Sequence, residues 1–125
     1  MLKITPTDTT KENEGAWTEY MGVQLKIARA QNPNFVAAIK KHTGLSKDKK
    51  DIDEEKLEEA MYLSMSEAVL MDWDNFVIDG KEVKYSQENA YELLKGDRDC
   101  REFVSSFSQE MQNFLDESRN STVKK

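Results

Sequence analysis

The chain has 125 residues, 34% of them charged, with 24 acidic against 18 basic side chains and a formal net charge of −6. This length suits one domain with a single modest core, and the acidic balance, offset by no basic block, argues against a nucleic-acid or membrane-surface partner. The single cysteine, Cys100, excludes an intrachain disulfide and fits a reducing cytoplasm. The polar N-terminus contains neither a signal-peptide core nor a transmembrane run, so we expect a soluble intracellular protein.

The first elements in chain order are a loose segment and a hairpin. Residues 1–14 lack apolar periodicity, and we expect them to be flexible apart from a short strand at Leu2–Ile4. Alternation of apolar and polar residues then predicts a β-hairpin over residues 16–28, with Met21-Gly22 as its turn and Trp17 on its outer face. The expected register joins three pairs of residues: Tyr20 with Val23, Thr18 with Leu25, and Ala16 with Ile27.

Two helices are predicted next. Asn32 is a good N-cap and Pro33 suits the first helical position, so a helix should begin there and stop at Gly44. A charged connector, residues 45–52, leads to a longer helix that begins at Asp53. Its apolar stripe is broad, so we expect a central helix covered on more than one side; the stripe contains Leu57, Met61, Ser64, Ala68 and Met71, flanked by Ala60, Leu63 and Leu70.

A second hairpin is predicted around Asp79-Gly80, a favoured two-residue turn because both positions need positive φ. The expected pairs are Ile78 with Lys81, Phe76 with Val83 and Asp74 with Tyr85, so that Phe76, Ile78, Val83 and Tyr85 share one face. Ser86 should then cap a short helix that Gly96 ends.

The last predicted helix has the most regular amphipathic pattern of the chain. Asp97 should cap it, and Arg101 and Glu102 fall on its polar side. Its apolar residues keep a three-four spacing through four turns: Cys100, Phe103, Val104, Phe107, Met111, Phe114 and Leu115. Residues 118–125 should form a flexible tail. We therefore predict a single α+β domain over residues 15–117, with small antiparallel β-hairpins packed against about four α-helices.

Few residues suggest chemistry. His42 is the one histidine and lies near a predicted helix C-terminus, where the helix dipole favours it, and no second histidine can complete a metal pair. Cys100 lies on an apolar stripe, where a free cysteine acts as a small hydrophobe rather than a nucleophile. The glycines stand singly, so no phosphate-binding loop is expected.

Asp72, Asp74 and Asp79 suggest a calcium loop, but the positions that an EF-hand reserves for Gly and Glu hold Val77 and Val83. We therefore expect no enzyme activity, no cofactor and no metal.

Binding of other proteins is the remaining interpretation. The chain has six methionines, and methionine-rich surfaces adapt to partners, although methionine also fills gaps in cores. The candidates for partner binding or self-association, in a possible homo-oligomer, are Met61, Met65, Phe103, Phe107, Met111 and Phe114.

The order of several segments over residues 15–115 resembles the tail assembly chaperone family of long-tailed bacteriophages. The segments are residues 17–29 running into Asn32-Pro33-Asn34-Phe35; Ala68-Val69-Leu70 with Trp73-Asp74-Asn75-Phe76; Asp79-Gly80 through Tyr85-Ser86, Asn89-Ala90 and Leu93-Leu94; and Arg101-Glu102-Phe103-Val104, ending near Asn113-Phe114. No family motif assigns individual binding residues.

The resemblance implies a protein that is not an enzyme and that works in the host cell cytoplasm. Such chaperones coat the tape measure protein, keep it soluble and recruit tail tube protein subunits, and they are absent from the finished virion. An alternative is a small structural tail or neck component of the virion. A third reading, an anti-defence inhibitor that mimics an acidic molecule, is disfavoured because acids and bases interleave along this chain.

Overall fold

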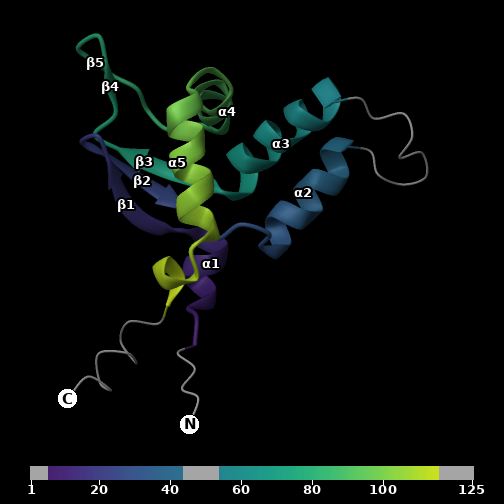
Figure 1. Cartoon of the computed structure of the whole chain (residues 1–125). Coiled ribbons are helices and arrows are strands. Elements are labelled where there is room, and N and C mark those ends of the chain that lie inside the picture. Colours follow the sequence, from purple (N-terminus) through teal and green to yellow (C-terminus); the bar gives the residue numbers. More distant parts are fainter. Residues whose placement is uncertain (1–5, 44–53, 116–125) are drawn as a thin grey trace, which may run out of the picture.

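An antiparallel sheet with the order β1-β2-β3 forms the centre of the computed structural model, which describes residues 6–43 and 54–115. Strands β1 (Ala16–Tyr20) and β2 (Val23–Ile27) form the first hairpin, and every predicted pair is present, from Tyr20–Val23 to Ala16–Ile27. Trp17 is exposed on the outer face as expected. The predicted α+β class is confirmed: the chain combines helices with this sheet and a second, two-stranded one, which projects away from the helices (Figure 1).

Strand β3 (Leu70–Asp74) joins the end of the predicted long helix to the start of the predicted second hairpin. It pairs with β2, placing Leu25 opposite Trp73 and Gln24 opposite Asp74, with a register shift between Lys26 and Ile27. The expected pairing of Asp74 with Tyr85 and the helical position of Leu70 and Met71 are therefore wrong. Pairing with β3 satisfies the second edge of β2 and buries Leu70 and Trp73, which a continued helix would not do.

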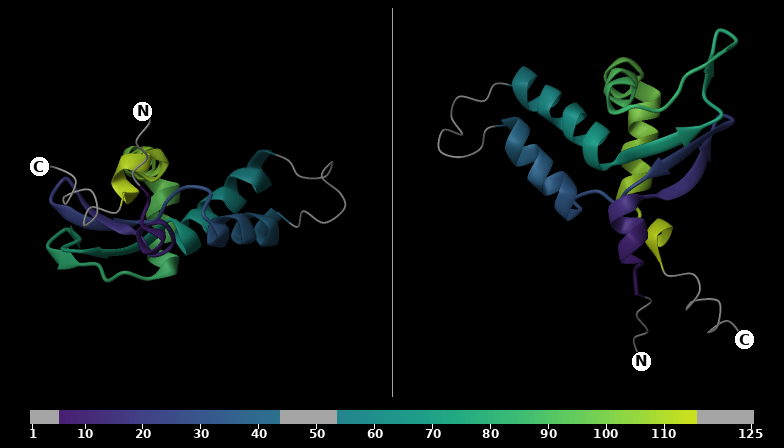
Figure 2. Two further views of the ribbon diagram at one scale, coloured as in Figure 1. Left: turned by 90° about the horizontal axis from the view of Figure 1, so that it is seen from below. Right: turned by 180° about the vertical axis from the view of Figure 1, so that it is seen from behind.

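Helices α2 (Pro33–Thr43) and α3 (Glu54–Ala68) run side by side and extend away from the sheet (Figures 1 and 2). The predicted cap of α2 is confirmed, because Asn32 Oδ1 accepts a hydrogen bond from the Phe35 N–H at 3.0 Å. Asn32 Nδ2 also donates to the Arg29 and Ala68 carbonyls, and so ties α2 to the end of α3. The predicted Gly44 stop, the connector 45–52 and the Asp53 start lie outside the described residues.

Only the C-terminal half of helix α3 lies in the core. Its C-terminal half is buried at Ser64, Met65 and Ala68, whereas residues 54–59 are all exposed. The expected cover on more than one side is present, since α2 and α4 both pack against α3, but one face of its N-terminal half stays open. Leu57 and Met61 lie on that face.

The second hairpin is shorter than predicted. Strands β4 (Val77–Ile78) and β5 (Lys81–Glu82) pair Ile78 with Lys81, and the Val83 N–H continues the pairing by donating to the Phe76 carbonyl at 2.8 Å. Phe76, Val83 and Tyr85 pack against the core, whereas Ile78, nearer the turn, is exposed.

The two predicted caps that follow are confirmed. Ser86 Oγ accepts from the Asn89 N–H at 3.0 Å and opens helix α4 (Gln87–Gly96), and Asp97 Oδ1 accepts from the Cys100 N–H at 3.0 Å and opens α5 (Arg98–Gln109). Helix α4 ends at Gly96 as predicted.

Helix α5 ends sooner than predicted, and a 3-10 helix, η2 (Met111–Phe114), follows an extended Glu110. Asn113 Nδ2 donates to the Phe107 carbonyl at 2.9 Å and satisfies one acceptor at the helix end. The change of direction turns Phe114 fully inward and leaves Met111 exposed. The predicted stripe is present from Cys100 to Phe107 and is wrong at Met111, because the helix ends at Gln109.

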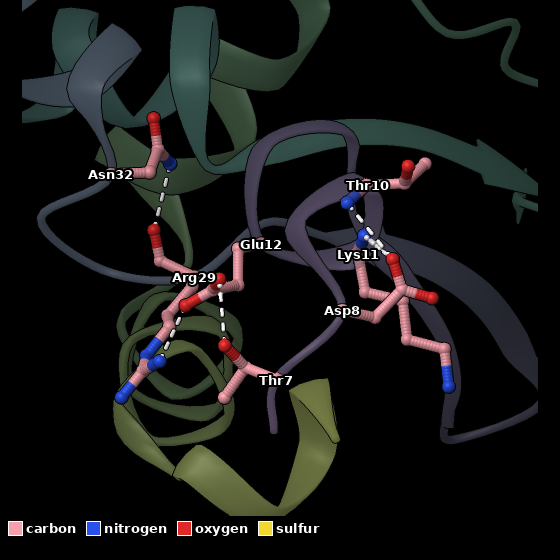
Figure 3. Close-up of polar contacts among 7 residues, drawn as sticks. All are labelled: Thr7, Asp8, Thr10, Lys11, Glu12, Arg29 and Asn32. Carbon is pink, nitrogen blue, oxygen red and sulfur yellow. Dashed lines mark hydrogen bonds and ion pairs between the residues drawn. The ribbon is translucent and has the colours of Figure 1, made fainter. Parts of the chain in front are cut away.

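A short helix, α1 (Thr9–Glu14), occupies part of the segment expected to be loose. Asp8 caps it, and Glu12 forms an ion pair with Arg29 and accepts a hydrogen bond from Thr7 (Figure 3). Thr7 also forms a β-bridge with Leu115, so the two ends of the described chain meet. The expected strand at Leu2–Ile4 and the tail at 118–125 lie outside the described residues.

The core lies between the sheet and helices α3, α4 and α5. Its largest fully buried side chains come from all of these elements and from η2, namely Leu25, Ile27, Leu70, Leu94, Val104, Phe114, Ser64 and Ser66. No helix in the described part of the chain is long and apolar enough to cross a membrane.

Candidate partner-binding groove

Helices α3 and α5 border an open groove of about 450 Å³, here called the α3–α5 groove. Helix α3 contributes its exposed N-terminal half, and α5 contributes one turn of its polar side. The lining residues are Glu54, Leu57, Glu58, Met61, Tyr62 and Met65 from α3, with Arg101, Glu102 and Ser105 from α5.

The floor of the groove is apolar. Leu57, Met61 and Met65 follow one another at intervals of four residues, which places them on one face of α3. The exposed fraction falls from 48% at Leu57 through 38% at Met61 to 7% at Met65, so the groove deepens toward the core. Two large apolar side chains therefore remain available to a partner.

Arg101 forms the wall between the groove and α4. Its Nη1 donates to the Leu94 carbonyl at 2.9 Å and to the Lys95 carbonyl at 3.4 Å. Its guanidinium carbon lies 4.9 Å from the centre of the Tyr62 ring, a cation–π contact. The Arg101 charge is thus directed at the C-terminal carbonyls of α4, where the helix dipole favours a cation.

The rim of the groove is acidic. Glu54, Glu58 and Glu102 supply three carboxylates against the one guanidinium of Arg101. Tyr62 donates its hydroxyl hydrogen bond to Glu58 at 2.6 Å, and this bond raises the pKa of Tyr62. Glu58 is thereby held beside the groove.

The structure brings together only two of the six candidate residues, Met61 and Met65, in this groove. Phe103 and Phe107 are partly buried against the core, and the Phe103 ring centre lies 4.6 Å from that of Tyr20. Phe114 is fully buried beside Phe107, with ring centres 5.8 Å apart, and Met111 is exposed away from the groove.

Sequence reasoning missed the polar part of the groove. Arg101 and Glu102 were assigned to a solvated face, and Tyr62 was not singled out. The four-residue spacing of Leu57, Met61 and Met65 was readable as a stripe, but nothing local indicates that α5 stops short of covering it.

The groups considered for chemistry have structural surroundings. His42 Nε2 lies 2.6 Å from Glu67 Oε1, with Lys41 Nζ at 3.2 Å from the same oxygen, and these contacts link α2 to α3. Burial opposes ionisation of Glu67, but the hydrogen bonds from His42 and Lys41 outweigh it and lower the pKa of the carboxyl. Burial, with a smaller effect of Asp97, raises the pKa of the Cys100 thiol to about 11, which disfavours a thiolate nucleophile.

Among the described residues, no group of three or more His, Cys, Asp or Glu side chains is placed to hold a metal ion. The α3–α5 groove combines an apolar floor with an acidic rim.

Comparison with known proteins identifies the chain's family. The model of the YdaY prophage protein family matches residues 27–125. The chain therefore belongs to this family and is a phage-derived protein. Neither the curated proteins nor the solved structures contain a match. The phage origin implied by the resemblance is thus supported, whereas the family description names no tail assembly role.

Proposed function

We propose that this phage protein is a tail assembly chaperone, which binds the tape measure protein, keeps it soluble and helps recruit tail tube subunits in the host cytoplasm. The observation that supports this most is the α3–α5 groove, where the fold leaves Leu57 and Met61 exposed beside Met65. The phage family and the tail-chaperone-like order of segments add to it.

The groove suits the task physically. A tape measure protein is expected to be largely long helix, exposing apolar stripes until the tail tube encloses it, and a helix can lay such a stripe into an apolar groove. Burying the exposed parts of Leu57 and Met61 would contribute about 1 kcal/mol each. Binding would then be weak per copy and strong only when many copies coat one partner, which allows later displacement.

Co-expression with the tape measure protein of the same phage genome tests the proposal. The tape measure protein should move from pellet to supernatant and elute with this chain on size exclusion, and the complex should persist in moderate salt because its main contact is apolar. A tape measure protein that stays insoluble would contradict the proposal. Stoichiometric amounts of this chain in purified particles would favour the structural tail or neck component instead.

A further inference from the structure

We infer that the α3–α5 groove binds a basic amphipathic helix of the partner, with its apolar stripe on Leu57 and Met61 and its lysine or arginine side chains against the acidic rim. The inference rests on the proposed function for the source of the helix, the tape measure protein. The groove itself specifies the chemistry of the occupant.

The apolar floor has the dimensions of a short helical contact. Residues 54–65 of α3 span about 18 Å, which corresponds to about three helical turns. An occupant lying along this line would place one apolar side chain per turn opposite Leu57, Met61 and the edge of Met65. The requirement is a stripe at three-four spacing rather than a single anchor.

The rim determines the charge of the occupant. Its three carboxylates face a single cation, and that cation, Arg101, is already hydrogen-bonded to the Leu94 and Lys95 carbonyls. Glu102 contacts Arg98 at 3.4 Å in an exposed i,i+4 pair, a weak interaction that a partner's cation can replace. Cationic side chains beside the partner's stripe would therefore be attracted to the rim, and carboxylates there would be repelled.

A second copy of this chain is a poorer occupant. Among the described helices, α2 is the one with a positive net charge, from Lys40 and Lys41. Its apolar side is already buried in its own fold through Phe35 and Ala38, so α2 has no free stripe to offer. The partner helix is thus expected to come from another protein.

Designed peptides test the chemistry directly on the full-length chain. The probes are labelled helical peptides of about 20 residues, long enough to form a helix. One has a leucine stripe flanked by lysine, one has the same stripe flanked by glutamate, and one is a scrambled form of the lysine peptide. Fluorescence anisotropy should show the lysine peptide binding about tenfold more tightly than the glutamate peptide, with an affinity that falls as salt rises. Equal affinity of the lysine and glutamate peptides, or of the lysine peptide and its scrambled form, would overturn the inference.

Paired variants localise the binding. L57A/M61A should abolish measurable binding, whereas V77A/I78A, which truncates two similarly exposed apolar residues on the second hairpin, should leave it unchanged. E54K/E102K should reverse the preference in favour of the glutamate peptide, whereas E88K/E92K on exposed positions of α4 adds the same charge and should not. Circular dichroism checks that each variant is folded.

Failure of the inference and failure of the proposed function are distinguishable. If L57A/M61A still solubilises the tape measure protein, the groove is not the binding site and the chaperone role stands. If the peptides and variants behave as expected but the tape measure protein stays insoluble, the helix-binding groove stands and the chaperone role is wrong. A wild-type dimer that L57A/M61A converts to a monomer would overturn the inference, because a second copy would then occupy the groove.

Discussion

The turns at Met21-Gly22 and Asp79-Gly80 have the same backbone form but hold hairpins of different length. All four residues have positive φ: 49° and 85° in the first turn, 52° and 77° in the second. Asp-Gly is the more favourable sequence for such a turn, yet it joins strands of two residues, whereas Met-Gly joins strands of five.

Burial explains the difference. Strand β2 is paired on both edges and contributes Leu25 and Ile27 to the core. At the tip of the second hairpin, Val77 and Ile78 are 54% and 50% exposed, and at its base the chain turns away at Asn75, where φ is 60°, so that Asp74 pairs with β2 instead. A good turn sequence thus places a reversal, and the packing of the flanking strands determines how far the ladder extends.

The largest contrast should come from truncating one apolar residue in each hairpin. Leu25→Ala removes a buried side chain from the central strand and should lower the free energy of unfolding by about 2–5 kcal/mol. Ile78→Ala acts at an exposed site and should change it by no more than about 0.5 kcal/mol. Urea unfolding of both variants measures the contrast, and similar losses would show that the second hairpin is as well packed as the first.

A smaller contrast is expected from the turn glycines. Apart from the adjacent residues, no atom lies within 4 Å of the position that a Cβ would take at Gly22 or Gly80, so the main cost of valine at either position is backbone strain. Gly22→Val should cost about 1–3 kcal/mol, the usual range for such strain, because the first hairpin is part of the core sheet. Gly80→Val should cost less than about 1 kcal/mol, because the short ladder can open locally instead. Thermal melts test this order, and the reverse order would contradict it.

The base of the second hairpin is better anchored than its tip, and a single hydroxyl tests this. Tyr85 donates its hydroxyl hydrogen bond to the Leu70 carbonyl of β3 at 2.7 Å. Tyr85→Phe should lower the free energy of unfolding by about 1–2 kcal/mol, because it removes one bond from a partly buried site. Trp73 Nε1, which donates to the Val83 carbonyl at 2.8 Å, remains as the other anchor. Wild-type stability in urea would show that this bond adds nothing.

Ionisation of the same hydroxyl should lower the stability of the protein, but only at alkaline pH. Burial, with a smaller effect of Asp72, raises the pKa of Tyr85 from 10.0 to about 12. The raised pKa stabilises the folded protein fully below pH 10, and this contribution is lost as pH rises toward 12. The free energy of unfolding, measured by urea denaturation at several pH values in this window, should therefore fall more steeply for the wild type than for Tyr85→Phe. Cys100, whose pKa is also raised, titrates in both proteins and so cancels from the comparison. Parallel curves would contradict the assignment.

The candidate groove was predictable only in part. The four-residue spacing of Met61 and Met65 placed them on one face of a helix, and the structure puts that face in the α3–α5 groove. Met111 was misplaced because the chain bends at Glu110, where no Gly or Pro marks the end of α5. Arg101 lies in the groove wall because it donates a hydrogen bond to the Leu94 carbonyl of α4, and the residues next to Arg101 in the sequence do not indicate this contact.

The sequence by itself determined the features that depend on a few adjacent residues: the two turns, the register of the first hairpin, and the caps at Asn32, Ser86 and Asp97. Each is set by local backbone geometry or by one side chain that bonds to a nearby N–H. Only the tertiary structure decided the pairing of β3 with β2, the helix α1 held by Glu12 and Arg29, and the exposure of Leu57. These depend on segments far apart in the chain, where burial and backbone pairing outweigh local preference.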